Sequence, residues 1–111
     1  MEMIKFTTAL LLLSFSLFTN ASYNANMSGV VSNVMLYTGG DYIYIQLNNQ
    51  PSSHATCNPS YFVISEEVPA ARRQMLLARL LTAHATKESV TIGYDNAGDC
   101  VHGYIRVHRV G

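Results

Sequence analysis

EEVPAARRQMLLARLLTAHATKESVTIGY, residues 66–94, is the stretch that decides the fold, because its hydrophobic period changes once. In its first part Pro69 suits an initial helical turn. Leucines then recur at i, i+1, i+4 and i+5, the spacing of one helix face: Leu76, Leu77, Leu80 and Leu81. The last part continues into ESVTIGYD at 88–95, which reads as a strand. The stretch predicts one helix over residues 69–85 that runs directly into a strand.

Upstream of the helix, a long β-hairpin is predicted. The run MSGVVSNVMLY at 27–37 is rich in β-branched residues and is followed by the turn signal TGGD. Strict alternation then marks DYIYIQLNN at 41–49 as a strand with one buried face. The predicted core face holds Ile43, Ile45 and Leu47. The opposite face holds Tyr42, Tyr44 and Gln46.

Two further strands complete the pattern. YFVIS at 61–65 is interpreted as a short buried strand, and GYIRVHRV at 103–110 as the last strand, after the turn NAGDCVHG. The predicted fold class is therefore mostly β with one helix, in the order β-β-β-α-β-β. Five strands with one helix between the third and fourth can close into an OB-fold-like barrel that the helix plugs at one end.

The first 21 residues are predicted to be a secretory signal peptide. Lys5 precedes an uncharged apolar run of about 13 residues, and small residues stand before a cleavage point after Ala21. The alternative, a transmembrane anchor, needs a longer run to cross about 30 Å of hydrocarbon. Residues 22–111 are then expected to form a single domain that is secreted or periplasmic, with no membrane span after cleavage.

The two cysteines agree with that compartment. Cys57 and Cys100 both stand in turn-like contexts, and pairing is the default for two cysteines outside the cytoplasm. A bond between them would restrict the unfolded chain by about 4 kcal/mol in the loop-entropy model. The alternative is a pair of metal or redox thiols, although the sequence contains no C-x-x-C.

Composition excludes some classes of function. Lys and Arg number 7 against 7 Asp and Glu, so the formal net charge is zero, which argues against a nucleic-acid partner. With 49% apolar and 13% charged residues, the chain is too hydrophobic to be disordered.

The passage MLLARLLTAHATKESVTIGY at 75–94, with the signal peptide, the cysteine pair and the element order, resembles small secreted bacterial OB-fold proteins. These include the B subunits of AB5-type toxins of the pertussis and subtilase kind and small single-domain proteins similar to them. The resemblance implies a secreted protein that binds host glycans, as a pentamer whose helices line a central pore. The sequence departs from the pattern in having no Trp and no serine-centred sugar pocket that matches residue by residue.

No catalytic, metal or cofactor signature is found. The 4 histidines form no H-E-x-x-H motif, and no serine stands in a G-x-S-x-G setting. The aspartates at 41, 95 and 99 stand in turns, where Asp is expected for backbone reasons. The sequence therefore predicts no enzyme, no metal site and no cofactor.

Two sets of residues are candidates for binding. The first is the hairpin group Tyr37, Tyr42 and Tyr44. The second shares one parity of the last predicted strand: His102, Tyr104, Arg106 and His108. Exposed tyrosines stack on sugars or anchor protein partners, but cross-strand pairs of them also stabilise a sheet without binding anything. The second set has a similar alternative, an ordinary solvated sheet face.

The predicted function is therefore binding to a glycan or a protein partner, with a homo-oligomer as the expected assembly. The alternative from another class is a structural or protein-interaction envelope factor with no small ligand.

Overall fold

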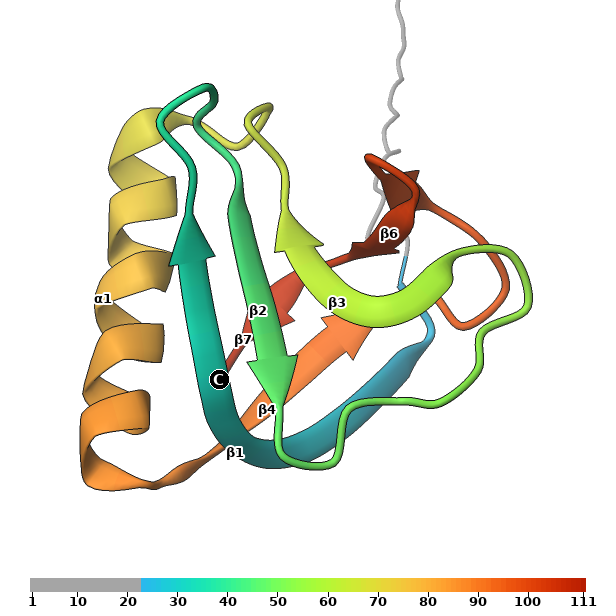
Figure 1. The fold of residues 1–111 in the computed structure, drawn as a ribbon, viewed down its shortest axis with the longest axis horizontal. Coiled ribbons are helices and arrows are strands. Elements are labelled where there is room, and N and C mark those ends of the chain that lie inside the picture. The colour runs from blue at the N-terminus through green and yellow to red at the C-terminus, as the bar shows by residue number, and fades with distance from the viewer. Residues whose placement is uncertain (1–22) are drawn as a thin grey trace, which may run out of the picture.

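The computed structural model describes residues 23–111 as one mixed β-sheet with one helix packed against it (Figure 1). The helix is α1 (Ala70–Thr86). The strands are β1 (Ala25–Leu36), β2 (Ile43–Leu47), β3 (Asn58–Ile64), β4 (Ser89–Tyr94), β5 (Cys100–Val101), β6 (Tyr104–Arg106) and β7 (Arg109–Val110). The predicted class, mostly β with one helix, is confirmed. The predicted signal peptide at 1–21 lies outside the described residues.

Within residues 23–111 the sheet has seven strands in the order β5-β6-β3-β2-β1-β4-β7, and only the β3–β6 pair is parallel. This pairing is not closed into a barrel, so the expected five-stranded barrel is not shown. The predicted last strand divides because the chain changes partner. The backbone N–H of Val107 donates to the carbonyl of Val63 in β3, whereas that of His108 donates to Gly93 in β4.

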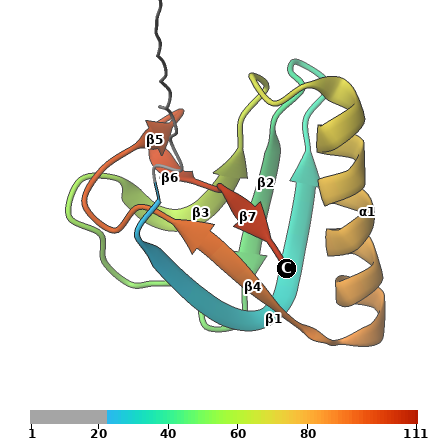
Figure 2. The same cartoon turned by 180° about the vertical axis from the view of Figure 1, so that it is seen from behind.

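Strand β1 connects the two halves of the sheet. Its first half pairs with β4 and its second half with β2, and a bulge lies between Val31 and Asn33. The strand curves strongly between these partners (Figure 2). Gly29 lets the side chain of Asn49 lie against the curve, since a Cβ there would lie 1.9 Å from Oδ1 of Asn49 and would displace that side chain.

Helix α1 begins after Pro69 and ends at Lys87, whose left-handed backbone (φ 62°) stops it. Leu80 and Ala83 are fully buried, and Leu76 and Leu77 pack partly against the core. Leu81 was expected on the core face, but 46% of it is exposed. The buried line follows steps of three and four residues, so the residue after Leu80 is turned about 100° away from the core.

The core lies between α1 and the concave side of the sheet. Its largest fully buried side chains are Phe62, Ile45, Ile64, Leu80, Ile92 and Ile105. At the other end of the molecule, Cys57 and Cys100 form a disulfide with a Cα–Cα distance of 5.5 Å, and neither cysteine is free. The bond joins the start of β3 to β5.

In residues 23–111 no helix is both long and apolar enough to cross a membrane.

Candidate functional site

Five tyrosines form a continuous surface on the outer side of the sheet. Tyr44 alternates in β2 with Ile43 and Ile45, which are 3% and 0% exposed, so its ring must point away from the core, as predicted. Tyr61 precedes buried Phe62, and Tyr104 precedes buried Ile105. The tyrosine surface, as we define it, consists of Tyr37, Tyr42, Tyr44, Tyr61 and Tyr104.

The strand order brings these rings together, because β6, β3 and β2 are neighbours. Tyr44 lies at the centre, with ring centroids 5.3 Å from three of the other rings and 5.5 Å from that of Tyr42. Tyr61 and Tyr104 lie 5.3 Å apart and Tyr37 and Tyr42 6.3 Å apart. All six pairs are tilted or edge to face, which aromatic quadrupoles favour.

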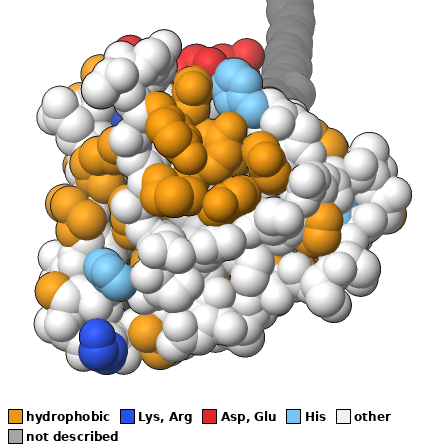
Figure 3. Space-filling model, viewed as in Figure 1, with side chains coloured by type: hydrophobic (Ala, Val, Ile, Leu, Met, Phe, Trp, Pro, Cys, Tyr) orange, Lys and Arg blue, Asp and Glu red, His pale blue; other side chains and the backbone are white. Residues whose placement is uncertain are grey.

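The surface is open to solvent at its edge and partly buried at its centre. Tyr37 is 50% exposed, while the other four rings are half-buried. Burial raises the pKa of Tyr44 above its ordinary value of 10.0, and the neighbouring tyrosines and Glu66 raise it further. The space-filling view shows one continuous hydrophobic patch on this side, with a histidine and acidic side chains at its upper edge (Figure 3).

A hydrogen-bonded pair of His102 and Glu66 borders the tyrosine surface. The ring of His102 lies 4.6 Å from that of Tyr42, and its Nε2 donates to the carboxylate of Glu66 at 3.0 and 3.2 Å. A hydrogen bond from its own backbone lowers the pKa of Glu66, and the bond from His102 lowers it further against the effect of desolvation. His102 and Gly103 have φ of 53° and 84°, as in the type I′ turn of a two-residue hairpin.

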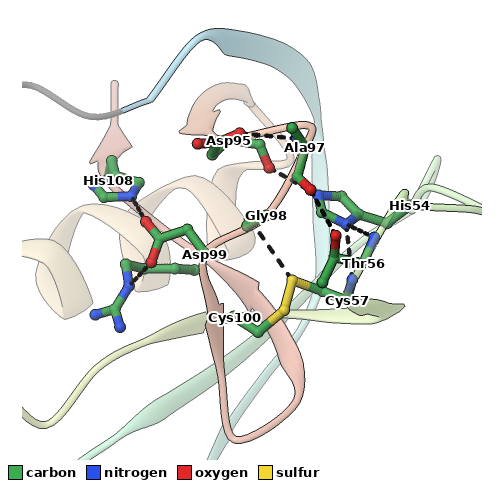
Figure 4. Close-up of a disulfide and its surroundings, with 10 residues drawn as sticks. His54, Thr56, Cys57, Asp95, Ala97, Gly98, Asp99, Cys100 and His108 are labelled. Atoms are coloured by element: carbon green, nitrogen blue, oxygen red, sulfur yellow. Dashed lines mark hydrogen bonds and ion pairs between the residues drawn. A yellow bond between two sulfur atoms is a disulfide. The ribbon is translucent and has the colours of Figure 1, made fainter.

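The four residues predicted to form a row on the last strand have two different sets of neighbours. His102 lies in the turn before β6, and Tyr104 joins the tyrosine surface. Arg106 and His108 turn instead to Asp99, whose two carboxylate oxygens accept from Nε of Arg106 at 2.7 Å and from Nε2 of His108 (Figure 4). The side chains of Arg106 and His108 thus fix the loop before β5, which contains Asp99.

Asp99 is the central acceptor of a second cluster, which it forms with Arg106 and His108. Burial alone would raise its pKa, but the hydrogen bonds and positive charges of His108 and Arg106 outweigh burial and hold the pKa below its usual 3.8. Asp99 precedes Cys100, so the cluster and the disulfide support the same loop. Arg106 also reaches Glu67 at 3.3 Å, and the ring of His108 stacks on Tyr23 at 5.7 Å.

The other two histidines have structural roles. His54 accepts backbone N–H groups of Thr56 and Cys57 at Nδ1 and donates from Nε2 to the carbonyl of Asp95 at 2.7 Å. His84 donates from Nδ1 to the carbonyl of Val31, which fastens α1 to β1. Among residues 23–111 no group of three or more His, Cys, Asp or Glu side chains could hold a metal ion.

A cavity of about 240 Å³ lies beside the tyrosine surface, between the turn that follows β1 and the first half of α1. Tyr42 belongs to both features, since its ring lines the cavity and also contacts Tyr37 and Tyr44. Gly40 makes this position possible, because a Cβ there would lie 2.3 Å from the Tyr42 ring.

Sequence reasoning did not include Tyr61 in the candidate site. The run YFVIS is predicted to be a short buried strand, in which Phe62 and Ile64 share one parity and Tyr61 and Val63 the other. Val63 is nevertheless 0% exposed, so alternation alone could not identify Tyr61 as an outward-facing residue. The parallel pairing of β3 with β6, which sets Tyr61 beside Tyr104, has no local sequence signal.

Comparisons with known proteins give no relative: no family model, curated protein or solved structure matches the chain.

Proposed function

We propose that this chain is a non-catalytic binding protein and that the tyrosine surface binds a glycan. The observation that carries the proposal is the continuity of the five rings, with neighbouring centroids 5.3 to 6.3 Å apart on one exposed side of the sheet. A sheet stabilised by a single cross-strand pair needs two such rings, not five.

The chemistry of this surface suits sugars. The apolar C–H face of a pyranose packs on an aromatic ring, while tyrosine hydroxyls supply hydrogen bonds to sugar hydroxyls. A single-stranded nucleic acid would need cationic side chains between the rings, whereas the formal net charge of the chain is zero. The proposed partner is therefore a glycan and not a nucleic acid.

The finer fold belongs to the same proposal. We infer an OB-type barrel in which β6 and β7 act as one strand, supported by the backbone hydrogen bonds that residues 107 and 108 make to β3 and β4 in turn. We also propose that the protein is secreted or periplasmic, with residues 1–21 as its signal peptide, and that it resembles a toxin B subunit. A homo-oligomer is supported by exposed apolar side chains on α1, where Met75 is 72% and Leu81 46% exposed.

A protein partner is the second candidate, because tyrosines with exposed edges are also frequent anchors of protein interfaces. The five rings of the tyrosine surface are the observation that favours a protein partner. In that case the chain acts as an envelope interaction factor with no small ligand.

A glycan array with the oxidised, folded protein tests the proposal, using Tyr37→Ala as the probe variant. Tyr37 is the most exposed of the five rings, so its removal should leave the fold intact and weaken glycan binding about 2- to 12-fold, the equivalent of about 0.5–1.5 kcal/mol. Arg72→Ala is the control, since it removes an exposed side chain from α1 that belongs neither to the tyrosine surface nor to the apolar side chains that support the homo-oligomer.

Binding that Tyr37→Ala weakens and Arg72→Ala does not would support the proposal. An array without hits, or hits that respond equally to both variants, would contradict glycan binding by this surface and favour the protein partner. Light scattering on the same samples measures the oligomeric state.

A further inference from the structure

The cavity beside Tyr42 combines apolar walls with planar polar groups. Its apolar lining includes Leu36, Tyr42 and Leu77, and its polar lining Asp41, Arg73 and Gln74. Sugar sites combine the same two elements, because a pyranose has C–H faces and a rim of hydroxyls that both donate and accept.

The charges of the cavity favour a neutral ligand. Nη1 of Arg73 already donates to the carbonyls of Val68 and Glu66, at 2.6 and 3.1 Å, so the guanidinium is held in place by the backbone. Its Nη2 lies 3.8 Å from Oδ2 of Asp41, so the formal charges of these two side chains sum to zero. An anionic ligand would be attracted by Arg73 but repelled by Asp41. A cationic ligand would be attracted by Asp41 but repelled by Arg73.

The cavity size limits the occupant to a small group. Its volume of about 240 Å³ is below the range of roughly 300–1,000 Å³ that is typical of sites for drug-sized ligands. A single ring is therefore the suitable occupant. Because Tyr42 also belongs to the tyrosine surface, a chain with one ring in the cavity can continue directly onto Tyr44.

We propose that this cavity binds one neutral pyranose residue of the glycan, whose following residues lie on the tyrosine surface. The proposal rests on the proposed glycan-binding function and adds the class of sugar and the place of one subsite. In this subsite the carboxylate of Asp41 accepts hydrogen bonds from sugar hydroxyls, and Gln74 and Arg73 donate hydrogen bonds to them. The ring of Tyr42 packs on the C–H face of the sugar.

Backbone amide NMR titrations of the oxidised protein test the subsite. The probes are the methyl glycosides of glucose, galactose, mannose and N-acetylglucosamine, the methyl glucuronide, cellotetraose and chitotetraose. A single ring should bind with a dissociation constant on the order of 1–10 mM. At least one neutral probe should shift the amides of Gly40, Asp41 and Gln74, and the glucuronide should bind more weakly than the matching glucoside.

Two variants and one control sharpen the test. Gln74→Ala should weaken the neutral probe about 2- to 12-fold, as expected for one lost hydrogen bond. Arg72→Ala, an exposed neighbour on α1 that does not line the cavity, should leave binding unchanged. Asp41→Asn should shift the preference several-fold toward the glucuronide, because it leaves the charge of Arg73 unbalanced.

The outcomes separate the two proposals. Shifts confined to the amides of Tyr44, Tyr61 and Tyr104 would overturn the subsite and leave the proposed function standing. Shifts at neither place with any probe, together with an empty glycan array, would overturn both. Preference of the wild type for the glucuronide would overturn the neutral sugar.

Discussion

Replacing Tyr44 with Ala tests whether the five rings support one another or merely lie side by side. Tyr44 contacts four rings at 5.3–5.5 Å, and each aromatic pair contributes about 0.5–1.5 kcal/mol beyond its buried area. The full range is about 2–6 kcal/mol. Since the ring is only half-buried, we expect Tyr44→Ala to lower the free energy of unfolding by about 2–3 kcal/mol.

Urea unfolding followed by far-UV circular dichroism, with the disulfide intact, measures this effect. Two variants set the scale. Tyr37→Ala removes two ring contacts from a half-exposed position and should lower the free energy of unfolding by about 1 kcal/mol or less. Ile45→Ala removes a fully buried side chain from the same strand as Tyr44 and should lower it by about 2–5 kcal/mol. If Tyr44→Ala costs no more than Tyr37→Ala, the reasoning about a mutually supporting cluster is refuted.

Alkaline titration gives an independent readout of the same cluster. The folded-state pKa of Tyr44 is raised above 10.0, so above pH 10 the unfolded chain releases this proton while the folded chain still holds it. The contribution of Tyr44 to stability is therefore complete below pH 10 and is lost as the pH rises through the folded-state pKa. Phenolate absorbance should show one tyrosine that ionises later than in the urea-unfolded protein.

Three further outcomes are expected. Leu80→Ala should cost about 2–5 kcal/mol in urea unfolding, whereas Leu81→Ala should cost about 0.5 kcal/mol or less, and equal costs would show the helix face to be wrong. Thiol titration of the denatured, unreduced protein should find no free thiol, and a Cys57→Ser, Cys100→Ser double variant should be about 4 kcal/mol less stable. Asp99→Asn should cost about 1–3 kcal/mol at neutral pH, and acid unfolding curves should show this difference shrinking as the pH falls from 3.8 through the lowered pKa of Asp99.

Local patterns predicted most of the individual elements. The helix expected over 69–85 is observed at 70–86, and alternation correctly placed Ile43 and Ile45 inward and Tyr44 outward. Both patterns reflect burial on one side of a single element, which neighbouring residues in the sequence encode directly.

The assembly of the site depended on pairing between distant segments, which no local pattern encodes. Tyr104 lies beside Tyr61 because β6 pairs with β3, although α1, β4 and β5 separate these two strands in the sequence. The single-parity pattern of the last strand did not predict that His102 lies in a His-Gly turn, at the border of the tyrosine surface. Nor did it predict that His108 lies where the chain has changed partner from β3 to β4 and that its Nε2 donates a hydrogen bond to Asp99.

The division of residues 104–110 between two partners has a consequence for the order of folding. Strand β3 and strand β4 can each form with their upstream neighbours, but the edge of each stays open until this segment arrives and pairs with both. Such pairing over long sequence separations is slow, and an open strand edge recruits other chains. A chain lacking residues 104–110 would expose the buried strand around Phe62 and the strand around Ile92 at once, and we expect it to aggregate during refolding instead of accumulating as a soluble, partly folded monomer.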